Sequence, residues 1–179
     1  MSVWSLFKKT SPTRDMDQPR TVLLASEGRR FTDEAIEVAA RLAREMGGQV
    51  RVLTIARMWG SGLGFPHPGL RPNKRELAEH EENVGLAIAR LTRSGIEAKA
   101  HIVTSRNPGK SIDRAAKRLN CEVIVMGADP RRGWLVRNFM WSQEPYRIHR
   151  RATIPVHLVC NEDVRSGASV GLADMRRSL

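Results

Sequence analysis

Short apolar runs alternate with stretches of helical periodicity through the middle of this 179-residue chain. Five segments have the length of a strand, and the third of them alternates apolar and polar residues as a half-buried strand does. The strands are expected at 21–25, 50–55, 96–104, 121–126 and 154–159. When a helix connects two neighbouring strands, the chain returns to the edge where the first strand began, so the two strands run parallel. Right-handed crossovers then place the helices on both faces of this mainly parallel sheet. The predicted fold class is therefore α/β, with an open, twisted, five-stranded sheet.

Capping signals mark the start of three of the four expected helices. These signals are Thr32 before Asp33, Asn73 with Glu76 three residues later, and Asn107 followed by Pro108. Gly47-Gly48 and Gly95 are placed to end the first two helices. The fourth helix is expected between 135 and 151, and its start is left open because Pro145 interrupts the helical pattern.

The two ends of the chain differ in composition from its middle. Residues 1–19 are polar and lack sustained periodicity, which predicts a flexible N-terminal arm. Residues 161–179 are also polar and contain Gly and Ser, which predicts a mobile tail, so the domain is expected at 20–160. The apolar patch Trp4–Phe7 in the N-terminal arm fits either a docking site or an irregular terminus, and both alternatives stay open.

Charge and composition narrow the classes of partner and compartment. Thirty Lys and Arg against nineteen Asp and Glu give a net charge of +11, which favours polyanionic or phosphorylated partners without choosing among them. No apolar run reaches the ~20 residues that span a bilayer, and the N-terminus lacks the order of a secretory signal. Cys121 and Cys160 are too few for a disulfide framework and indicate a reducing compartment. We therefore expect a cytoplasmic protein without a transmembrane segment.

The turn after the strand at 121–126 is the strongest candidate for a site. The strand stops at Gly127, and a turn rich in glycine, proline and arginine follows up to Gly133. Ligands bind just outside the carboxyl ends of the strands of an open parallel sheet, and arginines there can hold phosphate oxygens. The alternative is an ordinary strand-to-helix connection with solvated arginines.

Three stretches of this chain resemble the universal stress protein family, a member of the larger group of Rossmann-like adenine-nucleotide alpha hydrolases. Val22–Gly28 is similar to the family's opening strand and its Asp-Gly-Ser turn, although Glu27 stands where the family has aspartate. Glu122–Gly127 is similar to its fourth strand, and Ala152–Val159 to its closing strand. Together with the long loop after the second strand, the resemblance covers residues 20 to 160. It implies a Rossmann-like sheet of the universal stress protein type.

The resemblance also implies an adenine-nucleotide site, with departures from the family pattern. Family members that hold ATP carry a glycine, two residues, a second glycine, nine residues, and then glycine with Ser or Thr. Gly127 fills the first place, but Pro130 replaces the second glycine, and the third is missing near Ser142. Proline has no N–H to offer a phosphate, so the arginines of this loop would have to compensate. The resemblance implies a base near Ala25, Ser26, Glu27 and Thr54-Ile55, and phosphates over Gly127, Arg131, Gly133 and Ser142.

The expected function is a non-enzymatic, cytoplasmic stress-response or regulatory module. Its degenerate, arginine-rich pocket would bind ATP or another phosphorylated ligand weakly or not at all, and its protein partner is unknown. The resemblance implies a homodimer formed through the strand Pro155–Val159. No metal is expected, because none of the five histidines pairs with another His or a Cys at ligand spacing. The alternatives are a basic scaffold that binds nucleic acid and a slow ATP hydrolase.

Overall fold

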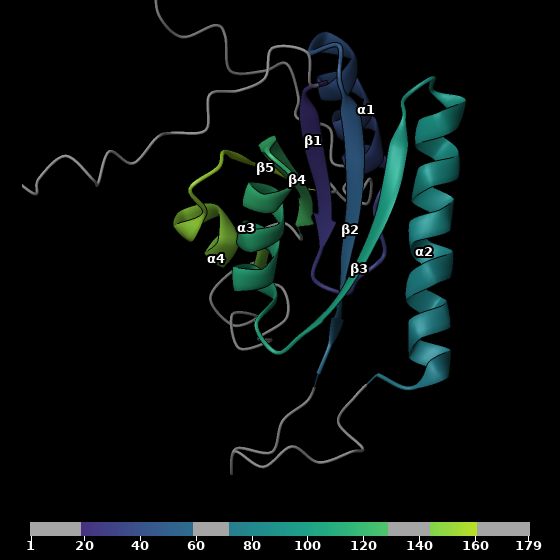
Figure 1. The fold of residues 1–179 in the computed structure, drawn as a ribbon, viewed down its shortest axis with the longest axis vertical. Coiled ribbons are helices and arrows are strands. Elements are labelled where there is room, and N and C mark those ends of the chain that lie inside the picture. The colour runs from purple at the N-terminus through teal and green to yellow at the C-terminus, as the bar shows by residue number, and fades with distance from the viewer. Residues whose placement is uncertain (1–18, 59–71, 129–143, 161–179) are drawn as a thin grey trace, which may run out of the picture.

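The computed structural model describes residues 19–58, 72–128 and 144–160, which form one five-stranded sheet with helices on both faces (Figure 1). In chain order the elements are β1 (Thr21–Ser26), α1 (Asp33–Glu45), β2 (Gln49–Arg57), α2 (Lys74–Arg93), β3 (Ala98–Ser105), α3 (Pro108–Arg118), β4 (Cys121–Ala128), α4 (Glu144–Arg151) and β5 (Val156–Cys160). The strand order is β3-β2-β1-β4-β5, and each neighbouring pair is parallel. The predicted α/β class with an open parallel sheet is confirmed.

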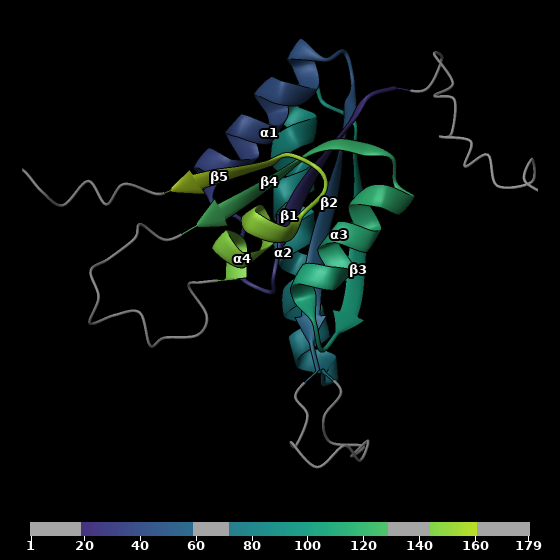
Figure 2. The same cartoon turned by 90° about the vertical axis from the view of Figure 1, so that its left-hand side faces the viewer.

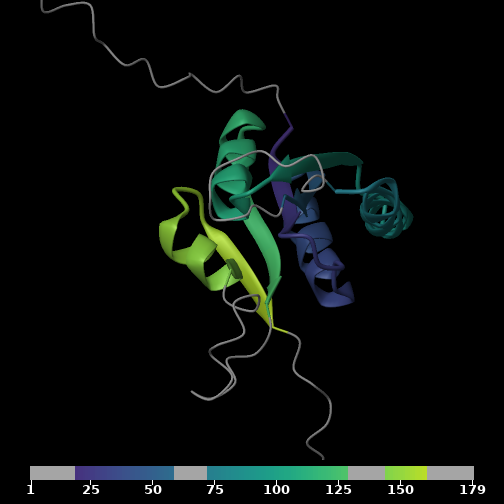
Figure 3. The same ribbon diagram turned by 90° about the horizontal axis from the view of Figure 1, so that it is seen from below.

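The central strand β1 is buried along its whole length because helices cover both of its faces. Its successive side chains enter two different cores: Val22 and Leu24 pack with α1 and α2, whereas Leu23 and Ala25 pack with α3 and α4. Figure 3 shows these two helix pairs on opposite sides of the sheet, and in Figure 2 the pair α3 and α4 faces the viewer. The continuous apolar run at 21–25 follows from this double burial.

The edge strands β3 and β5 are only partly buried, as the alternating pattern of 96–104 predicts for β3.

The two cysteines differ in burial according to the position of their strands in the sheet. Cys121 begins β4 and is buried, and Cys160 ends the edge strand β5 and is exposed. Burial raises the pKa of the Cys121 thiol to about 12, despite an opposing effect of the nearby Arg51 charge. Cys121 therefore acts as a small core side chain rather than as a nucleophile.

The three capping signals all operate in the structure. The Thr32 hydroxyl accepts a hydrogen bond from the backbone N–H of Ala35 at 3.2 Å. Asn73 and Glu76 form a complete capping box, in which each side chain accepts from the backbone N–H of the other residue. The Asn107 side chain accepts from the N–H of Lys110 at 3.2 Å, with Pro108 in the first turn of α3. These caps satisfy amide donors that a helix leaves free at its start.

The fourth helix, α4, lies within the range of 135–151 expected for it. Pro145 is buried in the first turn of α4, where a missing N–H costs no helical hydrogen bond. The part of the expected range at 135–143 lies outside the described residues, as do the N-terminal patch Trp4–Phe7 and the tail at 161–179.

No helix in the described ranges has the combination of length and apolar character that crossing a bilayer requires.

Candidate functional site

The turn between β1 and α1 is held tightly against the end of β2. The Ser26 hydroxyl donates to the carbonyl of Arg29 at 2.5 Å and accepts from the N–H of Gly28 at 3.2 Å. Gly28 has a φ of +112°, and a Cβ at this position would lie 2.9 Å from the carbonyl oxygen of Ile55. Glycine is required here twice over, because the backbone conformation disfavours a side chain and β2 leaves no room for one.

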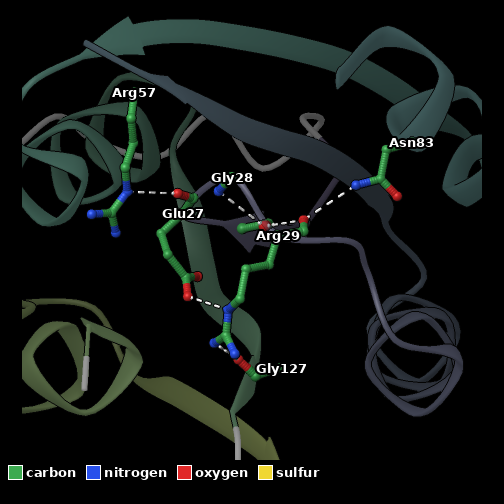
Figure 4. A network of polar contacts seen from close by, with 7 residues as sticks. Glu27, Gly28, Arg29, Arg57, Asn83 and Gly127 are labelled. Carbon is green, nitrogen blue, oxygen red and sulfur yellow. Dashed lines mark hydrogen bonds and ion pairs between the residues drawn. The ribbon is translucent and has the colours of Figure 1, made fainter. Parts of the chain in front are cut away.

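A buried carboxylate organises this turn (Figure 4). The Glu27 residue is only 4% exposed, and its Oε1 accepts from Nε of Arg29 at 2.6 Å. Arg29 also points Nη2 at the carbonyl oxygen of Gly127 at 3.5 Å, and its own carbonyl accepts from the Asn83 side chain at 3.2 Å. Nε of Arg57 donates to the Glu27 carbonyl at 3.1 Å. The network joins β1, β2, β4 and α2 at the carboxyl edge of the sheet.

A cleft of about 450 Å³, which we call the β1–β2 cleft, opens beside this network. Its described lining residues are Glu27, Gly28, Arg29, Ile55, Arg57, Pro72, Glu76, Glu79 and His80. Three carboxylates and two guanidinium groups therefore face it, together with one imidazole and the aliphatic groups of Ile55 and Pro72. The position matches the place where open parallel sheets bind ligands, outside the carboxyl ends of neighbouring strands.

Six of the residues predicted for the site are described, Thr54 near the end of β2 among them, and all lie at this edge of the sheet. Glu27 and Ile55 line the cleft, and Ser26 holds the turn beside it. Ala25 is buried in the core on the α3 face and does not line the cleft. Gly127 lies under the Arg29 guanidinium, and the Thr32 side chain is 3.4 Å from where its Cβ would be. The remaining predicted residues Arg131, Gly133 and Ser142 lie outside the described residues.

Sequence reasoning missed four polar residues of this region: Arg29, Arg57, His80 and Asn83. The position of Arg29 directly after a strand-end glycine could have marked it, because such turns lie at ligand sites. The sequence around His80 holds no signal that assigns this residue to the site. His80 is half-buried at the cleft, with Nδ1 3.5 Å from the Thr54 hydroxyl oxygen. Its placement depends on the packing of α2 against β2, which a local pattern does not reveal.

Within the described ranges, no three His, Cys, Asp or Glu side chains gather in a way that could hold a metal ion. The histidines at 80, 101, 149 and 157 all lie in these ranges, and His67 lies outside them.

Comparison with known proteins places this architecture among solved relatives. The model of the universal stress protein family matches residues 19–159. A universal stress protein from Archaeoglobus fulgidus is 19% identical with a TM-score of 0.60, over 81% of this chain and 95% of that chain. A universal stress protein from the same organism, in complex with dAMP, is 20% identical with a TM-score of 0.56, over 80% and 98%.

A universal stress protein family member from Arabidopsis thaliana with AMP bound is 16% identical with a TM-score of 0.50, over 84% of this chain and 98% of that chain. At these identities the structural likeness establishes the fold alone. No curated protein matches the sequence significantly.

Proposed function

The chain belongs to the universal stress protein family, and from this premise we propose that it is a non-enzymatic regulatory module that binds an adenine nucleotide weakly in the β1–β2 cleft. Binding would change the order of nearby loops or the affinity for a partner protein, without turnover of the ligand. The cytoplasm is the proposed compartment.

The observation that carries this proposal is the cleft itself. It lies at the carboxyl ends of β1 and β2, its volume falls in the range of small-molecule sites, and it combines the aliphatic Ile55 with polar groups. Solved universal stress proteins in complex with dAMP and with AMP support an adenine nucleotide as the ligand class.

The charge arrangement supports weak binding. The Arg29 guanidinium lies at Gly127, where a phosphate is expected, but it is already bound to the buried carboxylate of Glu27. A phosphate that approached Arg29 would therefore compete with Glu27 and be repelled by it. The ligand would gain less from this arginine than from an unengaged one.

We further propose that two copies pair through β5, in line with the expected homodimer at Pro155–Val159. The strand lies at the edge of the sheet, and His157 on it is exposed. An edge strand offers backbone N–H and C=O groups to a second strand. The Ile124 N–H donates to the Pro155 carbonyl, so residues 155, 157 and 159 direct their backbone groups toward β4, and Leu158 directs its N–H to the free edge. Sedimentation of the protein and of a Leu158→Pro variant tests the pairing, since proline removes this donor.

Native mass spectrometry for a co-purified nucleotide, followed by titration with a fluorescent AMP analogue, tests the binding proposal. His80→Trp fills the cleft, and Leu86→Trp on the same helix is a matched control, because Leu86 is 61% exposed and outside the cleft. We expect saturable binding that His80→Trp weakens about tenfold or more and Leu86→Trp leaves unchanged. Absence of saturable binding would contradict the proposal.

The same preparations decide between the two alternatives to this function. Release of phosphate from ATP above background would show a hydrolase instead of a non-enzymatic module. Binding of an oligonucleotide in place of AMP, with steep salt dependence, would support the basic nucleic-acid scaffold.

A further inference from the structure

A second cleft lies on the opposite face of the sheet, between α3 and α4. This α3–α4 groove has a volume of about 460 Å³ and is lined by Arg57, by the Arg106–Lys110 segment with Asp113, and by one side of α4. The two helices come close at Gly109, where a Cβ would lie 3.3 Å from both Oε1 of Glu144 and Cγ1 of Ile148. The glycine thus allows α4 to approach the first turn of α3.

The described lining of the groove is strongly basic. Five basic side chains face it against the two carboxylates of Asp113 and Glu144, a surplus of three positive charges. The five are Arg57, Arg106, Lys110, Arg147 and Arg151. The β1–β2 cleft, in contrast, has one more carboxylate than guanidinium groups in its described lining.

Three of these cations lack a local counter-ion. The side chains of Arg106, Lys110 and Arg151 make no hydrogen bond or ion pair with any other described residue. Neither of the two acids, Asp113 and Glu144, pairs with any of these three cations. Asp113 binds Nζ of Lys117 at 2.6 Å and accepts from Thr153, and Glu144 is 4.0 Å from Nη1 of Arg147. The positive charge of the groove is therefore available to a ligand.

Helix electrostatics do not explain two of these cations. Arg151 lies in the last turn of α4, where a positive charge complements the helix dipole. Arg106 and Lys110 instead flank the start of α3, whose first turn contains no acidic residue. Cations at a helix N-terminus are unfavourable, because they face the positive end of the dipole. An anion in the groove would relieve this repulsion and would also meet the α3 N-terminus.

We propose that the α3–α4 groove is a second binding site, for a small phosphorylated molecule that carries at least two negative charges. Phosphate oxygens suit the unpaired Arg and Lys groups, and Ile148 and Ala152 provide an aliphatic wall for the rest of the ligand. The groove is a different site from the proposed nucleotide cleft, since their described linings share Arg57 alone.

Pyrophosphate is a suitable probe, because it carries the required charge without a base. We would titrate the full-length protein with pyrophosphate by calorimetry, and compare Lys110→Gln/Arg151→Gln with Arg114→Gln/Arg150→Gln. Both pairs remove one positive charge from each of the same two helices, but Arg114 and Arg150 do not line the groove. Thermal melting would establish that both variants fold.

We expect the groove pair to weaken pyrophosphate binding about tenfold or more, and the control pair to change it less than about twofold. Equal losses in both pairs would indicate nonspecific charge attraction and overturn the proposal, as would absence of saturable binding to the unmodified protein. A short oligonucleotide that binds more tightly than pyrophosphate, and whose binding only the groove pair abolishes, would overturn the proposal of a small ligand and indicate nucleic acid instead. AMP binding in the β1–β2 cleft should be the same in both pairs. A result against the groove site can therefore be told apart from a result against the proposed function.

Discussion

The β1–β2 cleft and the α3–α4 groove have similar volumes but differ in whether their cations are paired with carboxylates. In the cleft, the central guanidinium of Arg29 is bound to a carboxylate that is almost completely buried. In the groove, Arg106, Lys110 and Arg151 have no such partner among the described residues. Charges paired inside the protein hold its elements together, whereas unpaired charges on a concave surface remain available to a ligand. Basic composition alone would not distinguish the two, because both contain arginine.

Replacement of Gly28 by alanine is the strongest way to disturb the cleft while leaving the groove intact. A φ of +112° is unfavourable for alanine, and its Cβ would lie 2.9 Å from the Ile55 carbonyl oxygen. We expect Gly28→Ala to lower the free energy of unfolding by about 1–3 kcal/mol, measured by chemical denaturation.

The control for this change is Gly85→Ala, in the middle of α2. A Cβ at Gly85 would meet nothing within 4 Å. Alanine in a helix interior should be neutral or stabilise the protein by up to about 1 kcal/mol. A similar loss in both variants would show that the Gly28 turn is not specially constrained.

Much of this fold could be predicted from local patterns. The caps at Thr32, Asn73 and Asn107 and the buried run of β1 each depend on residues close in sequence. The position of Glu27 at a strand end could be predicted for the same reason.

What could not be predicted are interactions across the fold. The contact from Arg29 to Gly127 joins residues 98 positions apart, and the bond from Asn83 to Arg29 joins residues 54 apart. The α3–α4 groove was missed for the same reason. Its basic cluster near 147–151 could be assigned to the helix dipole, and only packing brings it beside Lys110.

Arg57 connects the two regions, because it lines both. We expect Arg57→Gln to weaken AMP binding in the cleft and pyrophosphate binding in the groove, each by about tenfold, since a cation near the phosphates is lost. Arg41→Gln on α1, which lines neither site, is the control for net charge. Calorimetric titration with each ligand provides the measurement, and a loss confined to one ligand would show that Arg57 serves only that site.

The pairing of Glu27 with Arg29 should limit phosphate binding in the cleft alone. Glu27→Gln removes the negative charge but keeps an oxygen that can accept from Nε of Arg29. We expect AMP to bind about three to ten times more tightly, because the charge that repels the phosphate is gone and the neutral amide holds Arg29 less strongly than the carboxylate does. Glu79→Gln, whose side chain is 64% exposed in the same cleft, should have a smaller effect because water screens it. Weaker AMP binding to Glu27→Gln would show that the carboxylate itself contacts the ligand.

The smallest effect is expected for Asp113→Asn. This variant tests whether the contacts of Asp113 with Lys117 and Thr153 offset the repulsion between its carboxylate and an anion in the groove. Burial tends to raise the pKa of Asp113, but hydrogen bonds from Lys117 and Thr153 and the charge of Lys117 hold it below the usual value of 3.8. A carboxylate with a lower pKa in the folded chain stabilises the fold above its unfolded-state pKa, and this contribution is lost as the pH falls through the folded value. Asp113→Asn should therefore lower the free energy of unfolding at pH ~7 by less than about 1 kcal/mol, as for an ion pair that solvent still reaches at its Lys117 end.

Below both pKa values the wild-type and Asp113→Asn proteins should have the same stability, because the carboxyl is then neutral in both states of the wild type. Denaturation with urea at pH ~7 and pH ~2 measures the difference. Glu37→Gln on the exposed side of α1 is the control, since no ion pair of Glu37 is found among the described residues. The same Asp113 variant should bind pyrophosphate up to about twofold more tightly, because one carboxylate of the groove is gone. A stability difference that persisted at acid pH would assign the role of Asp113 to packing or to its neutral hydrogen bonds with Thr153 instead of to its charge.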